Sequence, residues 1–256
     1  MQNFKLSLKT VIIVLIITIL GMAVGNGQVL AASSQNTVKR YTLAANTKYS
    51  TDLYVIESNK PGPVVMIVGG VHGSEKAGYT AANQVKNWTI DKGTLLVLPR
   101  ANQRAIAKER RAIKGEGNLN RVFPRSKEKN PHHPLAADIW SVVKKYKVDW
   151  LMDMHEGVNY TKKSNSVGQS LIYYPDRQTR LMAKKIMKNL NQGISTSYKK
   201  FSLKKFPVKG SLARSSGQYL GVNSIIFETC DNPSLSVRVN YQLKAARTLL
   251  QELDML

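Results

Sequence analysis

The chain has 256 residues, enough for one sizeable domain with a substantial core. Its hydrophobic content of 43% and charged content of 21% are those of a folded globular protein, and they exclude intrinsic disorder. The formal net charge is +22, but no zinc-finger or RNA-binding signature accompanies it, so we expect no specific nucleic-acid partner. An anionic cell envelope would suit so basic a chain, and a surface charge that only aids solubility is the alternative.

The first 31 residues have the layout of a secretory signal peptide. Two lysines make the start basic, an uncharged apolar run covers 11–24, and small residues at 29–31 suit cleavage. A membrane-spanning helix needs about 20 apolar residues, which is more than this run offers. We therefore expect a cleaved signal and a secreted or envelope-associated protein, with an uncleaved membrane anchor as the alternative.

Residues 32–256 are expected to form a single domain. Apolar runs in it alternate with amphipathic segments, which predicts strands alternating with helices. After a polar lead-in at 33–38, strands are predicted at 41–43, 52–57, 64–68, 93–98, 148–154, 170–174 and 222–227. Helices are predicted at 76–88, 134–146, 177–190, 210–219 and 235–255. This order predicts an α/β fold, namely a three-layer α/β/α domain with a mixed, mostly parallel central sheet.

Two further features constrain the domain. Residues 99–131 are polar, basic and poorly periodic, and a loop this long in a compact domain is usually functional or mobile. Residues 194–208 are basic and variable in character. Cys230 is the only cysteine, so no intrachain disulfide can form, and we expect a buried side chain rather than a nucleophile.

A glycine-rich turn, Gly69-Gly70-Val71-His72-Gly73-Ser74-Glu75, follows the predicted strand at 64–68. Open α/β sheets place their sites at the carboxyl ends of strands. His72 and Glu75 offer an imidazole nitrogen and a carboxylate oxygen close enough to hold one ion. Zinc accepts both donor types, and a catalytic zinc keeps one position open.

Two other predicted strands also lead into residues suited to metal-dependent hydrolysis. The strand at 148–154 leads to His155, and the strand at 222–227 leads to Glu228. Each residue alone has an ordinary explanation: a surface or core histidine, or a carboxylate at a helix N-terminus. Their joint placement at strand ends is what points to a metal site.

The segment Asn118-Leu119-Asn120-Arg121 suggests a carboxylate-binding pair. A guanidinium group binds a carboxylate through two parallel hydrogen bonds, and a neighbouring amide adds a directional one. An arginine in a basic loop is more often merely solvated, so this interpretation depends on the metal site beside it.

Taken together, the motifs GGVHGSE, NLNRVFP, DMHEG and IIFET resemble the zinc carboxypeptidase superfamily, and most closely its succinylglutamate desuccinylase and aspartoacylase-like branch. The resemblance implies a zinc-dependent hydrolase that cleaves an amide beside a free carboxylate. It implies these roles: zinc ligands His72, Glu75 and His155; general base Glu228; carboxylate-binding residues Asn120 and Arg121. It also implies an arginine at the scissile carbonyl, for which we choose Arg111, with Arg110 as the alternative.

One departure from the family pattern concerns the histidine ligands. The family usually has aspartate where this chain has Asn118, and that aspartate accepts a hydrogen bond from the first zinc histidine. Loss of such a carboxylate costs roughly 10- to 100-fold in metal affinity or activity, although the amide oxygen of Asn118 is still able to accept. Because side chains alternate along a strand, we expect Glu156 to face away from the metal, whereas Asp153 shares the face of His155.

The sequence thus predicts an exported zinc-dependent amide hydrolase, of carboxypeptidase or deacylase type, acting on a substrate with a free carboxylate. A cell-wall peptide is the expected substrate class. An N-acyl-amino-acid deacylase is the first alternative, and an inactive envelope-binding protein that retains the fold is the second. A serine hydrolase is disfavoured because the chain has no Gly-x-Ser-x-Gly elbow.

Overall fold

Eight strands form one sheet in the part of the chain that the computed structural model describes, residues 36–127, 129–160 and 166–256. They are β1 (Thr37–Leu43), β2 (Thr51–Glu57), β3 (Val64–Gly69), β4 (Thr94–Leu98), β5 (Trp150–Gly157), β6 (Ser170–Tyr173), β7 (Ser202–Lys205) and β8 (Asn223–Cys230). Their order is β1-β2-β4-β3-β5-β8-β6-β7. The signal-peptide prediction at 1–31 lies outside the described residues.

The four central strands, β4, β3, β5 and β8, run parallel, and the antiparallel pairs lie toward the edges of the sheet. Parallel strands bring their carboxyl ends to one edge, so residues distant in sequence meet there. The predicted mixed, mostly parallel sheet is confirmed.

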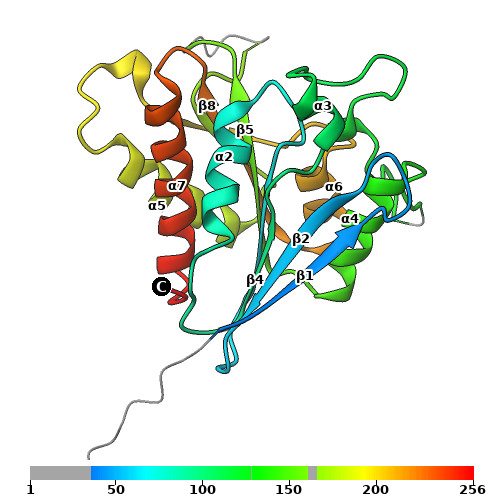
Figure 1. The fold of residues 1–256 in the computed structure, drawn as a ribbon. Coiled ribbons are helices and arrows are strands. Elements are labelled where there is room, and N and C mark those ends of the chain that lie inside the picture. The colour runs from blue at the N-terminus through cyan, green and yellow to red at the C-terminus, as the bar shows by residue number, and fades with distance from the viewer. Residues whose placement is uncertain (1–35, 128, 161–165) are drawn as a thin grey trace, which may run out of the picture. The chain divides into compact units, whose positions relative to one another are not determined.

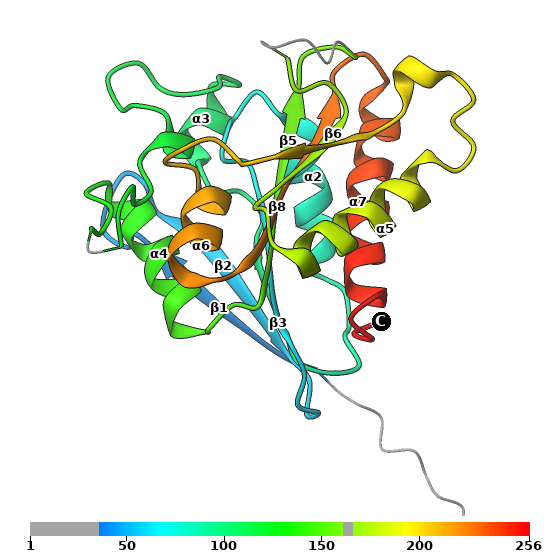
Figure 2. The same cartoon turned by 180° about the vertical axis from the view of Figure 1, so that it is seen from behind.

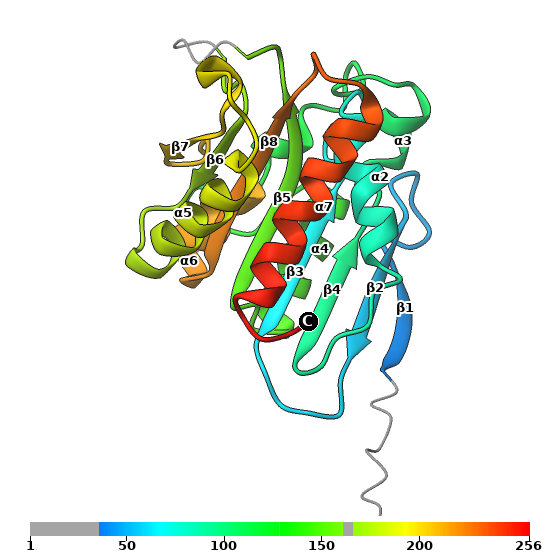
Figure 3. The same ribbon diagram turned by 90° about the vertical axis from the view of Figure 1, so that its left-hand side faces the viewer.

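Helices cover both faces of this sheet (Figures 1 and 2). One layer contains α2 (Lys76–Val85), α5 (Arg177–Asn191) and α7 (Leu235–Gln251), which pack on one another. The opposite face carries α4 (Pro134–Lys145) and α6 (Leu212–Leu220). Figure 3 shows α7 running along the sheet beside α2. The predicted α/β/α arrangement is therefore confirmed, and none of the helices in the described residues has the length and hydropathy needed to cross a membrane.

Side chains of the central strands alternate between two separate cores, as strand geometry requires. Trp150, Met152 and Met154 of β5 pack toward the α2 and α7 layer. Leu151 packs toward the α4 and α6 layer. His155 shares the parity of Leu151, so the sheet directs it away from α7.

Three parts of the chain differ from the prediction. A short helix, α3 (Gln103–Ala107), interrupts the predicted long loop, and β7 forms where only a variable basic segment was expected. With five residues, α3 is too short to show a helical period, and Asn102 caps it by accepting from the Ala105 amide at 3.1 Å. The strand β1 begins at Thr37 rather than at 41, because its mostly exposed residues show no alternation but pair with β2 along their whole length.

Candidate metal centre

The turn after β3 has a backbone that only glycine accommodates well. Gly70 has a φ of +75°, in the left-handed region, and a Cβ on Gly73 would lie 1.9 Å from the backbone of Ala105. The amide of Gly73 donates to the carbonyl of Arg110 at 3.0 Å. The glycines thus let α3 and the following loop pack directly on the turn that carries His72.

His72, Glu75 and His155 meet in one buried cluster, with candidate ligand atoms that all lie within 4.8 Å of one another. The Nδ1 atoms of the two imidazoles are 3.2 Å apart. One carboxylate oxygen of Glu75 lies 2.7 Å from His72 Nδ1, and the other lies 2.7 Å from His155 Nδ1. Two nitrogens and a carboxylate therefore converge on one point.

This donor set fits a zinc ion. Tetrahedral zinc with ligands at about 2.0–2.1 Å needs neighbouring donors about 3.3 Å apart. The observed separations of 2.7–3.2 Å fall short of that by a few tenths of an ångström. A slight opening of the three side chains would satisfy the ion, and the donors are the nitrogen and oxygen atoms that zinc accepts.

The outward nitrogen of each histidine lies beside an acceptor, which fixes the direction of the ring. The Oδ1 of Asn118 accepts from His72 Nε2 at 3.0 Å, so the asparagine does take the place of the usual aspartate. The same oxygen accepts from the Asn120 amide at 2.8 Å. Asp153 Oδ2 lies 3.0 Å from His155 Nε2, an ion-pair distance without hydrogen-bond angles. Both rings thus present Nδ1 to the centre, as second-layer partners of metal-bound histidines generally ensure.

The charges in the cluster stabilise one another. Burial alone would raise the pKa of Glu75, but His155 and His72 outweigh burial and hold that pKa well below its usual range. Burial lowers the pKa of His72 despite the carboxylate beside it. Burial also opposes charging of His155, yet Asp153 and Glu75 raise its pKa well above the usual value. Glu75 and the two histidines therefore interact strongly at a site with little access to water.

Glu228 lies on the same face of the sheet as His155. The two residues are register partners on the parallel strands β5 and β8, which both continue beyond the ends that the sequence predicted. Glu228 is buried and its Oε2 has no hydrogen-bond partner. Burial, reinforced by the charges of Glu75 and Asp153, raises the pKa of Glu228 to about 8, against the lowering effect of His155 and Arg111. A carboxyl group held in this way is suited to accepting and returning a proton near neutral pH.

Glu156 faces the opposite side of the sheet, as strand alternation predicts. Its carboxylate accepts from the Ala77 amide at 2.9 Å and forms an ion pair with Arg238 of α7. On the same side, Gln242 of α7 donates to the His155 carbonyl at 2.8 Å and to the Thr229 hydroxyl at 3.2 Å. Helix α7 therefore holds β5 and β8 together from behind the cluster.

The sequence prediction did not include Gln242. Val239, Gln242 and Ala246 recur on one buried stripe of α7, and a polar residue in the middle of an apolar stripe is the signal that could have revealed it.

Of the two candidate arginines, only Arg111 reaches the cluster. Its Nη1 donates to Glu75 Oε1 at 2.7 Å, and its side chain is 55% exposed. Arg110 contributes its carbonyl to Gly73, while its side chain lines a separate hollow. The geometry thus favours Arg111 over Arg110 for contact with a group bound at the cluster.

The predicted carboxylate-binding pair lies at the short 3₁₀ turn Leu119–Arg121. Asn120 is buried and its Oδ1 has no partner. The Nη1 of Arg121 donates to the Asn120 carbonyl at 2.7 Å. Burial lowers the pKa of Arg121, and the nearby charges of Arg111 and Arg125 lower it further. An anion near Arg121 and Arg111 would relieve this repulsion.

The buried His-Glu-His cluster offers the nitrogen and oxygen donors that catalytic metal sites use, at the edge where open α/β sheets place their sites. Residues 61–213 match the model of the succinylglutamate desuccinylase/aspartoacylase catalytic domain, and the chain belongs to this family of amide-hydrolysing enzymes. The match ends before Glu228, so its placement rests on the sheet register alone. No curated protein is similar enough in sequence to match the chain.

Solved structures with the same fold are distant in sequence. The Gln46His variant of the cell shape determinant protein Csd4 from Helicobacter pylori has a TM-score of 0.66 and 20% identity, over 80% of this chain and 55% of that chain. The mDAP-bound form of Helicobacter pylori Csd4, a D,L-carboxypeptidase, has a TM-score of 0.63 and 20% identity, over 76% of this chain and 52% of that chain. A succinylglutamate desuccinylase/aspartoacylase from Rhodobacter sphaeroides has a TM-score of 0.61 and 18% identity, over 87% of this chain and 66% of that chain. The chain thus spans about half of the Csd4 chains, and these identities show a shared fold.

Proposed function

We propose that this protein is an exported zinc-dependent amide hydrolase acting on a small peptide with a free carboxylate, and that a cell-wall peptide is its substrate class. One observation carries the proposal: Glu228 lies in register beside His155, on the face of the sheet where His72 and Glu75 complete the donor set. A base next to a three-donor metal site is the minimum that metal-assisted hydrolysis requires.

Each residue has a distinct chemical task in this proposal. Zinc, held by His72, Glu75 and His155, would supply Lewis acidity and lower the pKa of water at the site. Glu228 accepts a proton from the attacking water and returns it to the leaving nitrogen. Arg111 offsets the negative charge that develops on the scissile carbonyl oxygen.

The substrate carboxylate is assigned to Arg121 and Asn120. Arg121 supplies a charged fork, and the unpartnered Oδ1 marks Asn120 as a buried side chain with hydrogen-bonding capacity left over. Holding the carboxylate at this point determines which amide bond lies next to Glu228.

The proposed peptide substrate draws on the Csd4 structures, which include mDAP-bound and tripeptide-bound forms. The family description instead favours an N-acyl-amino-acid deacylase, which is the second candidate. Export rests on the signal-like sequence at 1–31, and contact with an anionic envelope rests on the net charge of +22. The hydrogen bond from His72 to Asn118 argues against an inactive protein, because the substitution leaves the ring oriented.

Metal analysis of the purified protein tests the proposal first. We expect one zinc per chain, lost in His72→Ala because one of three donors is removed. His132→Ala is the matched control, since His132 is an exposed histidine of the loop before α4. Release assays that compare cell-wall peptides with N-acyl amino acids then separate the two candidates. Full zinc retention in His72→Ala would contradict the proposed site.

A further inference from the structure

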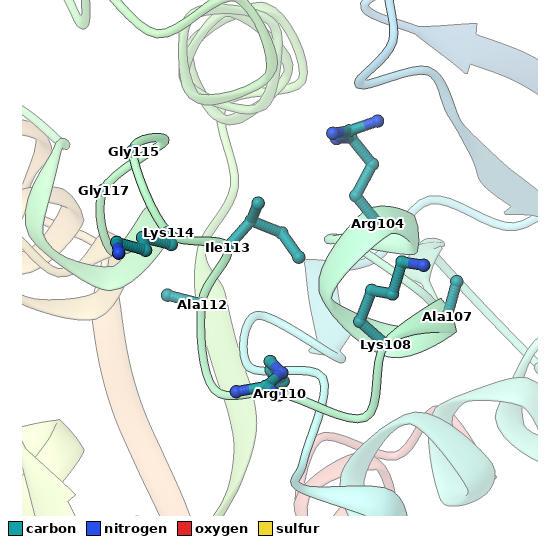
Figure 4. Close-up of a pocket in the computed structure, with 9 residues that line it drawn as sticks. All are labelled: Arg104, Ala107, Lys108, Arg110, Ala112, Ile113, Lys114, Gly115 and Gly117. Carbon is teal, nitrogen blue, oxygen red and sulfur yellow. The ribbon is translucent and has the colours of Figure 1, made fainter.

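A hollow of about 760 Å³ lies between α3 and the loop that follows it. Figure 4 shows Arg104 and Lys108 on the α3 side, and Arg110 and Lys114 on the loop side. Ile113 projects between these two sides and gives the hollow an apolar surface. None of the metal-cluster residues lines it, so it is a separate space from the cluster.

The hollow has a strong excess of positive charge. Its lining contains four cationic side chains and no carboxylate. Glu116, which stands between the lining residues Gly115 and Gly117, forms ion pairs with Arg104 at 2.8 Å and with Lys48 at 2.9 Å.

The other three cations of the hollow, Lys108, Arg110 and Lys114, form no ion pair with any residue that the structure describes. Glu109, between the first two, is held by Lys76 at 2.8 Å. Three unneutralised cations around one space raise the local concentration of anions.

The wall of this hollow is tied directly to the metal centre. The backbone carbonyl of Arg110 accepts from the Gly73 amide, one residue from His72, while the side chain of Arg111 donates to Glu75. Arg111 is also close enough to Arg121 to lower its pKa. The three arginines therefore run from the carboxylate-binding pair, past the cluster, to the hollow.

We propose that the hollow binds an acidic side chain on the acyl arm of the substrate, which is the arm opposite to the carboxylate held by Arg121. The inference rests on the proposed function, because it assigns the second end of the same substrate. The aliphatic surface of Ile113 packs against the stem of that arm, and Lys108, Arg110 and Lys114 neutralise its carboxylate. The preferred substrate is thus an acidic peptide with anions on both sides of the scissile bond.

The test uses two N-acetylated tripeptides of equal size, Glu-Ala-Ala and Gln-Ala-Ala, which both keep a free C-terminal carboxylate. Binding to the zinc-loaded Glu228→Gln protein is measured by calorimetry, so that no turnover is needed. We expect the Glu peptide to bind roughly 10-fold more tightly, the lower end of what charged hydrogen bonds contribute, because these cations are exposed. The preference should fall as salt is raised, because exposed charges are screened.

The decisive variant carries Lys108→Gln, Arg110→Gln and Lys114→Gln in addition to Glu228→Gln. We expect it to lose the Glu-over-Gln preference and to bind the Gln peptide as before. The matched control replaces Arg180, Lys184 and Lys188, three exposed cations of α5, and should keep the preference. The inference is overturned if the hollow variant keeps the preference for the Glu peptide. It is also overturned if the protein with an unaltered hollow shows no such preference.

The same experiment separates this inference from the proposed function. Cleavage of both peptides by the unmodified protein without any preference would leave the hydrolase intact and remove the acidic subsite. A binding preference that depends on the hollow, with zinc bound but neither peptide cleaved, would support the subsite and contradict the hydrolase.

Discussion

The candidate metal centre and the loop that faces it are held in place by different means. His72, Glu75, His155 and Glu228 are each at most 8% exposed, and they follow or belong to the parallel strands β3, β5 and β8. The loop at 103–125 has only the five-residue helix α3 and one 3₁₀ turn, and many of its basic side chains are exposed. The sheet therefore positions His155, Glu228 and the turn that carries His72 and Glu75, whereas the loop brings Arg111 and Asn118 against them.

The sharpest way to test this contrast is to change the base without changing its shape. Glu228→Gln should lower kcat by roughly 100- to 10,000-fold, the contribution of a general base. Because Glu228 is not among the three donors, bound zinc should remain at one per chain, measured by metal analysis. Glutamine keeps the shape of the side chain and cannot ionise in this buried position, so thermal unfolding should occur at no lower temperature.

Loss of zinc from that variant would make Glu228 a ligand and would contradict the division between donors and base. Thr229→Ser, one residue along β8 but on the other face, provides a control that should change kcat little.

The next largest effect is expected where the loop touches the cluster. Arg111→Gln should lower kcat by roughly 100- to 1000-fold, as loss of a single oxyanion-stabilising donor does. Arg110→Gln should leave kcat nearly unchanged for a substrate whose acyl arm is uncharged, because the Arg110 side chain lines the hollow instead. Steady-state kinetics on the Gln tripeptide compares the two. An equal loss of kcat in both variants would contradict the assignment of different roles to Arg110 and Arg111.

A smaller effect is expected from the partner of His72. Asn118→Ala removes the acceptor that orients the ring, which should weaken zinc binding by roughly 10- to 100-fold. Asn118→Asp supplies a charged acceptor of the same shape and should tighten binding. Competition with a zinc chelator measures both. If the alanine variant binds zinc as tightly as the original, the sheet alone orients His72.

Much of the buried region could be predicted from the sequence because strand periodicity determines it. The apolar run at 64–68 predicted β3, and the turn with His72 and Glu75 follows from it. Alternation along β5 correctly placed His155 and Glu156 on opposite faces. The parallel order of strands then brings distant strand ends to one edge, whatever the loops do.

The exposed loop could not be predicted in the same way. Nothing in the local pattern around Arg110 and Arg111 decides which one reaches Glu75, since that depends on how Gly73 and Ala105 pack together. The helix α3 is too short to produce a period, and β7 pairs at the edge of the sheet with little burial. The roles assigned to Asn120 and Arg121 remain predictions that the substrate assays test.

The weakest expected effect concerns the back of the sheet, where α7 supports the cluster without entering it. Gln242→Leu leaves the His155 carbonyl and the Thr229 hydroxyl without their buried donor, which should cost about 1–3 kcal/mol of stability. Denaturant unfolding measures this cost, and the matched control is Asn240→Leu, an exposed position on the same helix. Because the donors of the cluster lie on the other face, zinc binding should weaken far less than in Asn118→Ala. A collapse of zinc affinity with unchanged stability would mean that α7 positions His155 directly, and the buried cluster would then depend on more than its own strands.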